Sequence, residues 1–129
     1  MKSAFLFIFF ASNVLFLMLH TALQKLQNIS QRPEKLIIGL MSGTSLDGLD
    51  IALCRFRKSQ GILHWDLLAH NTWPYPDTLR QELQSLCFQA NASLQSLALM
   101  HCRLPRLWAV QVLAQLEKWQ ISPQEIDLL

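Results

Sequence analysis

The chain has 129 residues, a formal net charge of +2 and a hydrophobic fraction of 51%. This length suits one domain of modest size, which can bury a core without disulfides or a structural metal. The basic residues are scattered and form no Lys/Arg stripe, which argues against nucleic acid as a partner. Cys54, Cys87 and Cys102 are odd in number and lack C-x-x-C spacing. They argue against a disulfide framework or a zinc site and predict small buried side chains.

An apolar run occupies residues 4–23, with Lys2 before it and no acidic residue, Lys or Arg inside it. Its length approaches the roughly 20 residues of a membrane-spanning helix. Its polar residues weaken that interpretation, and a signal peptide would need a clearer cleavage site. An anchor, a signal peptide and an extension from a mis-set start therefore all stay open. We divide the chain into a hydrophobic leader with a polar link, residues 1–33, and a domain, residues 34–129.

Three segments of strand-forming residues follow the link, at 35–41, 49–56 and 62–68. After Lys35 the first segment is an apolar run, which is typical of a strand buried on both faces. The second alternates and places Leu49, Ile51 and Leu53 on one side. A polar turn at 57–61 ends in glycine and suits a hairpin. The short connections predict an antiparallel meander of three strands.

Helical patterns come next. Pro76 and Asp77 are both favoured in a first turn. An apolar face at helical spacing then comprises Leu79, Leu83, Leu86 and Cys87. Residues 91–93 predict a break and a new N-cap. Pro105 is expected to kink or restart the second helix, because proline removes a backbone donor.

The last residues combine a capping pattern with an apolar run. Ser122 and Glu125 have capping-box spacing, with Pro123 at the first helical position. Residues 126–129 look like the beginning of another strand. Because chain termini are normally polar and exposed, this ending favours a truncated sequence.

The connection between the first two strands reads Ser-Gly-Thr-Ser-Leu-Asp-Gly, residues 42–48. Its glycines permit positive φ and close approach to a ligand, and successive N–H groups can form an anion-binding nest. It is neither a Walker A loop nor a dinucleotide fingerprint, because it lacks Gly-Lys-Ser/Thr and G-x-G-x-x-G. A plain hairpin turn at Asp47–Gly48 explains the same residues. The residues alone therefore leave phosphate binding and a simple turn both open.

The longer segment Ile-Gly-Leu-Met-Ser-Gly-Thr-Ser-Leu-Asp-Gly-Leu-Asp, residues 38–50, resembles the opening motif of the anhydro-N-acetylmuramic acid kinases. Looser similarity extends over residues 35–129, at Trp73-Pro74-Tyr75-Pro76, Leu107-Trp108-Ala109 and Glu125-Ile126-Asp127-Leu128-Leu129. The last segment resembles the strand before the family's His-Gly-Gln-Thr motif. The resemblance implies an α/β fold, the amino-terminal portion of an actin-like, ribonuclease H-like ATPase domain.

The family opens the 1,6-anhydro ring of anhydro-N-acetylmuramic acid with water and phosphorylates O6, using ATP, to recover cell-wall sugar. The resemblance thus implies ATP and Mg²⁺ as cofactors, a small sugar as substrate and a cytoplasmic protein, and it leaves a homodimer open. Membrane association would require a real anchor at residues 4–23.

The resemblance also assigns site residues. Those facing the ATP phosphates would be Gly43, Thr44, Ser45, Leu46, Asp47, Gly48, Leu49 and Asp50. Backbone N–H groups of Gly43, Thr44 and Ser45 would hold phosphate oxygens. Asp47 would orient water bound to Mg²⁺, unless it only caps the turn. No catalytic residue is expected here, since the family's general base is an Asp beyond residue 129, and no metal ligand is assigned.

Other polar residues carry no chemistry on this interpretation. The carboxylates Asp66, Asp77 and Glu82 are expected to be solvated or capping. The histidines His64, His70 and His101 have no partner spacing and predict ordinary surface or core roles. Three hypotheses remain: the first part of a sugar kinase, a truncated non-catalytic protein of the same fold, and a membrane-anchored interaction protein.

Overall fold

The computed structural model describes residues 19–88 and 92–129, and the chain divides into two units, Met1–Pro33 and Glu34–Leu129. In the first unit, residues 19–31 are helical. Most of the apolar run predicted at residues 4–23 lies outside the described residues. Among the helices of the described ranges, none combines the length and the apolar character needed to cross a membrane.

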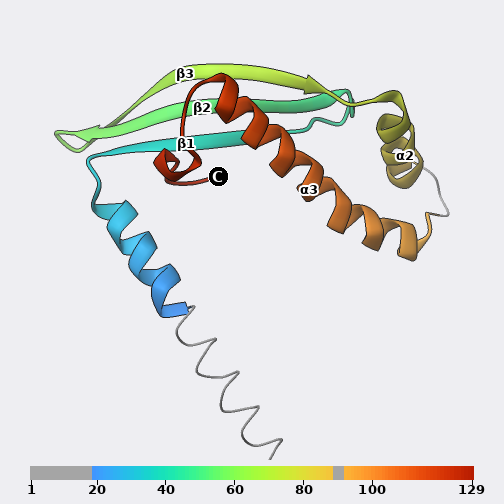
Figure 1. Cartoon of the computed structure of the whole chain (residues 1–129), viewed down its shortest axis with the longest axis horizontal. Helices are drawn as coiled ribbons and strands as arrows, with labels where there is room; N and C mark the ends of the chain where they lie inside the picture. The colour runs from blue at the N-terminus through green and yellow to red at the C-terminus, as the bar shows by residue number, and fades with distance from the viewer. Residues whose placement is uncertain (1–18, 89–91) are drawn as a thin grey trace, which may run out of the picture. The chain divides into compact units, whose positions relative to one another are not determined.

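The second unit is built on a three-stranded antiparallel sheet with the order β1-β2-β3 (Figure 1). The strands are β1, Glu34–Met41, β2, Gly48–Ser59, and β3, Ile62–Pro74. Gln60 and Gly61 form the tight turn between β2 and β3, with φ of 51° and 81°. Positive φ at both positions matches the twist of a two-residue hairpin. The predicted meander is therefore confirmed, although β3 is longer than the sequence indicated.

One face of the sheet carries the core. Leu49, Ile51 and Leu53 alternate along β2 and are 0%, 1% and 1% exposed, as their period-2 pattern predicted. Residues of the two following helices, together with Tyr75, complete this core. The prediction that β1 is buried on both faces is wrong, because only Ile38 of this strand is buried. The helices cover one side of the sheet, so alternate residues of β1 stay at least partly open.

Two helices follow the sheet: α2, Asp77–Phe88, and α3, Leu94–Lys118. Ser93 caps α3, and its hydroxyl accepts a hydrogen bond of 3.4 Å from the N–H of Ser96. The restart predicted at Pro105 is wrong, because α3 passes through this proline as one helix. Core contacts of Met100 before the proline, and of Val112 and Leu116 after it, offset the one hydrogen bond that proline cannot donate.

The end of the described chain lies against β1. Ser122 and Glu125 form the predicted capping box, which begins the short 3-10 helix η1, Pro123–Glu125. Leu128 then makes a parallel bridge to Ile37, and its carbonyl accepts from the N–H of Ile38 at 3.0 Å. The apolar ending thus joins the edge of β1 that is not paired with β2.

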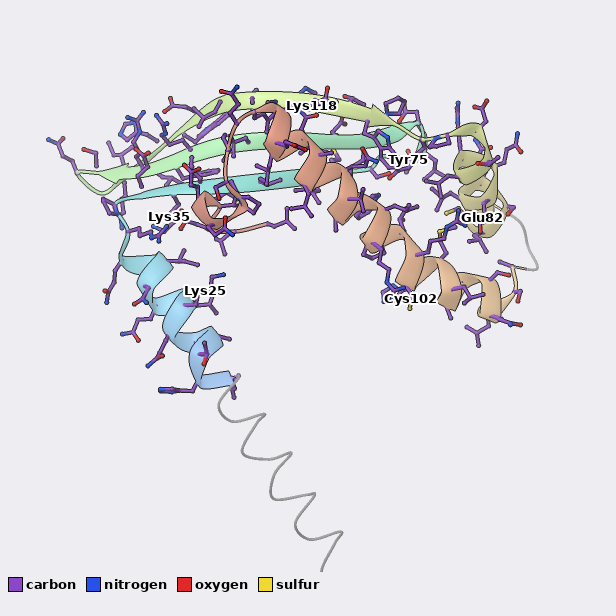
Figure 2. The ribbon with its side chains drawn as sticks, viewed as in Figure 1. Lys25, Lys35, Tyr75, Glu82, Cys102 and Lys118 are labelled. Atoms are coloured by element: carbon purple, nitrogen blue, oxygen red, sulfur yellow. The ribbon has the colours of Figure 1, made fainter. Side chains whose placement is uncertain are left out.

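The prediction of buried cysteines is wrong, because none of the three is fully buried. Cys87 and Cys102 are exposed, and Cys54 is half-buried. Cys102 projects from α3 in Figure 2. The apolar positions that face the sheet are taken by larger leucine, methionine and valine side chains, so the helical cysteines fall on the solvent side.

Candidate phosphate-binding site

The loop between β1 and β2 comprises residues 42–47, and the three remaining predicted site residues, Gly48, Leu49 and Asp50, already belong to β2. A turn forms within the loop, where the N–H of Leu46 donates to the carbonyl of Gly43 at 3.1 Å. The expectation that a glycine supplies the positive φ is wrong. Leu46 takes that conformation, with φ of 51°.

The first half of the turn presents unpaired donors to solvent. Gly43, Thr44 and Ser45 are all exposed, and their N–H groups have no protein acceptor among the described residues. A Cβ added to Gly43 would meet only the Ser45 hydroxyl, at 3.6 Å. A ligand can therefore come close to this backbone. Three consecutive free N–H groups are the donors that a phosphate needs in an anion-binding turn.

Gly48 has a different role from Gly43. A Cβ at Gly48 would lie 2.6 Å from the carbonyl oxygen of Trp73, a distance at which the backbone must shift. Gly48 is therefore needed for close packing of β2 against β3. The next residue, Leu49, is fully buried, so its side chain belongs to the core.

The two carboxylates at the second half of the motif differ in their surroundings. Asp47 is exposed, and its Oδ1 accepts a hydrogen bond of 2.8 Å from the Ser45 hydroxyl. Asp50 is half-buried, and its Oδ1 accepts from the Thr72 hydroxyl at 2.6 Å and lies 3.7 Å from Nε2 of His70. The Asp50 carboxylate thus interacts with two side chains of β3. The Asp47 carboxylate faces solvent beside the free N–H groups.

The described residues offer no group of three or more His, Cys, Asp or Glu side chains that could hold a metal ion by themselves. Mg²⁺ is usually bound by one or two carboxylates together with water and substrate phosphates. Asp47 fits that arrangement, because it is a single exposed carboxylate next to donors for phosphate. The site therefore suits a metal that arrives with a nucleotide.

Tyr75 ties both ends of the loop, a role that its sequence context did not predict. Its N–H donates to the carbonyl of Asp47 at 2.9 Å, and its hydroxyl donates to Oγ of Ser42 at 2.9 Å. The indole N–H of Trp108 donates to the same hydroxyl at 2.9 Å. Residues 73–76 indicated only the beginning of a helix. Sequence periodicity carries no signal for hydrogen bonds between residues so far apart.

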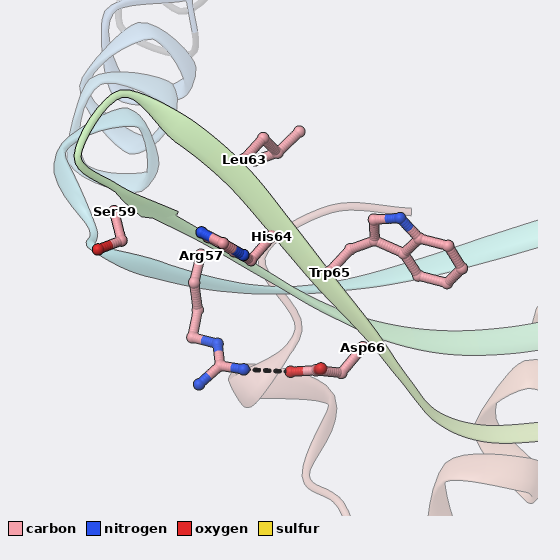
Figure 3. A pocket seen from close by; sticks show the side chains of 6 residues that line it. All are labelled: Arg57, Ser59, Leu63, His64, Trp65 and Asp66. Carbon is pink, nitrogen blue, oxygen red and sulfur yellow. Dashed lines mark hydrogen bonds and ion pairs between the residues drawn. The ribbon is translucent and has the colours of Figure 1, made fainter.

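A cavity lies at the opposite end of the sheet, over the β2–β3 hairpin. It has a volume of about 530 Å³, and the residues that line it include Arg57, Trp65 and Asp66 (Figure 3). Arg57 and Asp66 form an ion pair across it, so its main charged groups already satisfy each other. Glu82 likewise pairs with Arg103 at 2.7 Å. These carboxylates are exposed partners of arginines, and the hairpin cavity is a weaker candidate than the loop.

The sequence of the second unit matches a known family. The family described as anhydro-N-acetylmuramic acid kinase matches residues 35–129, which is most of the chain. The chain belongs to this family. The three-strand meander followed by helices is the amino-terminal portion of the actin-like, ribonuclease H-like α/β domain, so the predicted fold class is confirmed.

Individual relatives agree with the family match. The chain is 34% identical over 111 residues to an anhydro-N-acetylmuramic acid kinase of Pseudoalteromonas translucida (strain TAC 125), covering 86% of this chain and 28% of the relative. It is 36% identical over 107 residues to the protein of that name in Pseudoalteromonas atlantica, covering 83% and 27%. For Pasteurella multocida, identity is 37% over 93 residues, covering 71% and 23%. The chain thus spans less than a third of the length of these relatives.

Proposed function

We propose that this chain forms the phosphate-binding portion of an ATP-dependent sugar kinase. The kinase would open 1,6-anhydro-N-acetylmuramic acid with water and phosphorylate O6, giving N-acetylmuramic acid 6-phosphate in the recycling of cell-wall sugar. Support comes from the family match over residues 35–129 and from the names of the relatives. A cytoplasmic location follows from the same proposal, because ATP is the phosphate donor.

The observation that carries the proposal is the run of free donors at the loop. In this proposal the N–H groups of Gly43, Thr44 and Ser45 bind phosphate oxygens of ATP. Residues 42–50 contain neither Lys nor Arg, so the loop itself supplies no positive side chain. Neutral N–H donors can orient phosphate without a full charge, as they do in other phosphate-binding turns.

Mg²⁺ would provide the positive charge that the loop lacks. Kinases neutralise their phosphates with Mg²⁺, and positioning together with electrostatic stabilisation accounts for most of the catalysis. Asp47 would orient water bound to the metal. Its position beside Ser45 places a carboxylate next to the phosphate donors without blocking them.

The general base is assigned outside residues 1–129. Phosphoryl transfer needs a positioned nucleophile, a base and charge stabilisation on the transferred group. Asp50 is not assigned this role, because its Oδ1 already accepts a hydrogen bond from Thr72. We therefore expect the purified 129-residue chain to bind nucleotide weakly and to transfer no phosphate.

A chimera tests the function. Residues 35–129 replace the matching segment of the Pseudoalteromonas translucida relative, which supplies the remaining part of a kinase. The expected result is ATP-dependent conversion of the anhydro sugar to its 6-phosphate, detected by mass spectrometry. The unaltered relative is the positive control. A folded chimera that binds ATP without forming product would instead favour a non-catalytic protein of the same fold. A folded chimera that does not bind ATP would refute the proposal.

A further inference from the structure

Three side chains from distant segments form a chain of hydrogen bonds that ends at the loop. The indole N–H of Trp108, on α3, donates to the hydroxyl of Tyr75 at 2.9 Å. Tyr75 lies just before α2, and its hydroxyl donates to Oγ of Ser42 at 2.9 Å. Ser42 is the residue directly before the free N–H groups of the loop. Figure 2 marks Tyr75 near the point where the sheet meets α2.

The chemistry of the three groups fixes the direction of this relay. An indole N–H can only donate, so the Tyr75 oxygen must accept from Trp108. Tyr75 is buried, and Ser42 is the acceptor that the described residues offer its single hydroxyl proton, so that proton is directed to Ser42. Because Oγ of Ser42 accepts that proton, the proton of Ser42 itself has to point away from Tyr75. The relay therefore leaves the hydroxyl proton of Ser42 available to an acceptor other than Tyr75.

The surroundings hold this arrangement in place. Tyr75 is 5% exposed, and its ring meets Trp73 edge-on, with a centroid distance of 5.4 Å and an interplanar angle of 74°. Its N–H also holds the far end of the loop through the carbonyl of Asp47. Ser42 is only half-buried, so its proton can reach a ligand. Successive hydrogen bonds polarise one another, which strengthens the terminal donor.

We propose that Ser42 is a phosphate-binding residue whose hydroxyl donates to an oxygen of the ATP phosphates. Tyr75 and Trp108 are positioning residues, which fix the direction of that hydroxyl. This inference rests on the proposed function and extends it, because the earlier assignment begins at Gly43 and uses backbone donors. A structural role alone would make the Tyr75 hydroxyl a satisfied core group with no influence on the ligand.

The relay itself is tested without a ligand, on the full ¹⁵N-labelled chain in mild detergent. Replacing Tyr75 by Phe removes the hydroxyl and keeps the ring. The indole N–H signal of Trp108 should then shift upfield and exchange faster with solvent. An unchanged Trp108 signal in Tyr75→Phe would overturn the relay, whether or not the protein binds nucleotide.

The role of Ser42 is tested by measuring the affinity of the same chain for MgATP and for inorganic tripolyphosphate. Ser42→Ala should weaken both by at least about tenfold, the weight of one hydrogen bond to a charged group. Ser42→Thr, which keeps the hydroxyl, should retain most of the affinity. A similar loss for tripolyphosphate and for MgATP assigns the contact to phosphate rather than to the nucleoside.

The positioning residues should have smaller effects that depend on Ser42. Tyr75→Phe and Trp108→Phe should each weaken binding about threefold, the weight of one neutral hydrogen bond. In the Ser42→Ala background, Tyr75→Phe should add nothing, because the donor it orients is gone. Trp73→Phe is the matched control, since it alters the neighbouring ring and keeps all three groups of the relay.

The two proposals fail in different ways. Absence of any binding by the parent chain would refute the phosphate-binding loop and, with it, the role of Ser42. Binding by the parent with an unchanged affinity in Ser42→Ala would leave the loop in place and overturn only the inference about Ser42. Additive losses in the double variant would remove Tyr75 as a positioning residue.

Discussion

The connections at the two ends of β2 are both largely exposed, yet they use their polar groups differently. At the hairpin end, Gln60 and Gly61 close a tight turn, and Arg57 forms an ion pair with Asp66. At the loop end, three consecutive N–H groups stay free, and a buried tyrosine holds the loop from both sides. The cavity of about 530 Å³ lies at the hairpin end, whereas the free N–H groups of Gly43, Thr44 and Ser45 lie at the loop.

This difference favours the loop over the hairpin cavity as the candidate site, because the N–H groups of the loop are free. Buried polar groups normally find partners, and exposed ones that a rigid neighbour holds in place are ready for a ligand. At the hairpin, the charged side chains of Arg57 and Asp66 pair with each other. The loop keeps its shape through Tyr75 while leaving its own donors unused, and the following predictions test that contrast.

The largest effect is expected for stability at Gly48. In Gly48→Ala the new Cβ would lie within 2.6 Å of the Trp73 carbonyl, so β2 and β3 must move apart. We expect a loss of about 3 kcal/mol in the free energy of unfolding, at the upper end for overpacking. Urea unfolding followed by tryptophan fluorescence measures it. Gly39→Ala is the control, because a Cβ there meets nothing within 4 Å. Equal stability of the two variants would contradict the packing role of Gly48.

Gly43→Val should affect the ligand and spare the fold. Gly43 does not use a positive φ, so valine brings no backbone strain of that kind. Its side chain would cover the backbone that a phosphate must approach. We expect the affinity for MgATP to fall by at least about tenfold, or about 1.4 kcal/mol. The melting temperature should stay close to that of the parent. Calorimetric titration and thermal unfolding give the two numbers, and normal ATP affinity would remove the loop from the site.

Much of the second unit could be predicted from local pattern. The alternation of Leu49, Ile51 and Leu53 identified the buried face of β2, and the spacing of Ser122 and Glu125 identified the last cap. Both signals depend on neighbours within a few residues. Pro105 misled the prediction because its local penalty is outweighed by tertiary packing along α3, which no local pattern contains.

The site was only partly predictable, for the same reason. The motif located the loop, but it credited the glycines with the positive φ that Leu46 adopts. It also missed the bonds that join Tyr75 to Ser42 and to Trp108, each spanning 33 residues. Such contacts are set by how β3, α2 and α3 pack together. A sequence pattern can therefore locate the loop, but the hydrogen bonds that hold the loop in place are visible only in the packed structure.

Asp47→Asn should have an intermediate effect on metal use. Asparagine keeps an acceptor for Ser45 and suits the turn, so only the charge is lost. A unit charge about 4 Å from a second charge in water is worth about 1 kcal/mol. We therefore expect the Mg²⁺ concentration for half-maximal ATP binding to rise by about five- to tenfold. Titration with Mg²⁺ at fixed ATP measures it. An unchanged metal dependence would leave Asp47 as a turn residue.

The smallest effect is expected at the hairpin, with Asp66→Asn. The side chains of Arg57 and Asp66 are 48% and 47% exposed, and exposed ion pairs contribute at most about 1 kcal/mol. Water and salt already screen both charges, so losing one should change the stability by about 0.5 kcal/mol or less. The affinity for MgATP should equal that of the parent, because the loop lies at the other end of β2. Unfolding in urea at low and high salt, together with ATP titration, measures both quantities. A marked loss of ATP affinity in Asp66→Asn would place the hairpin in the site and end the contrast between the two ends.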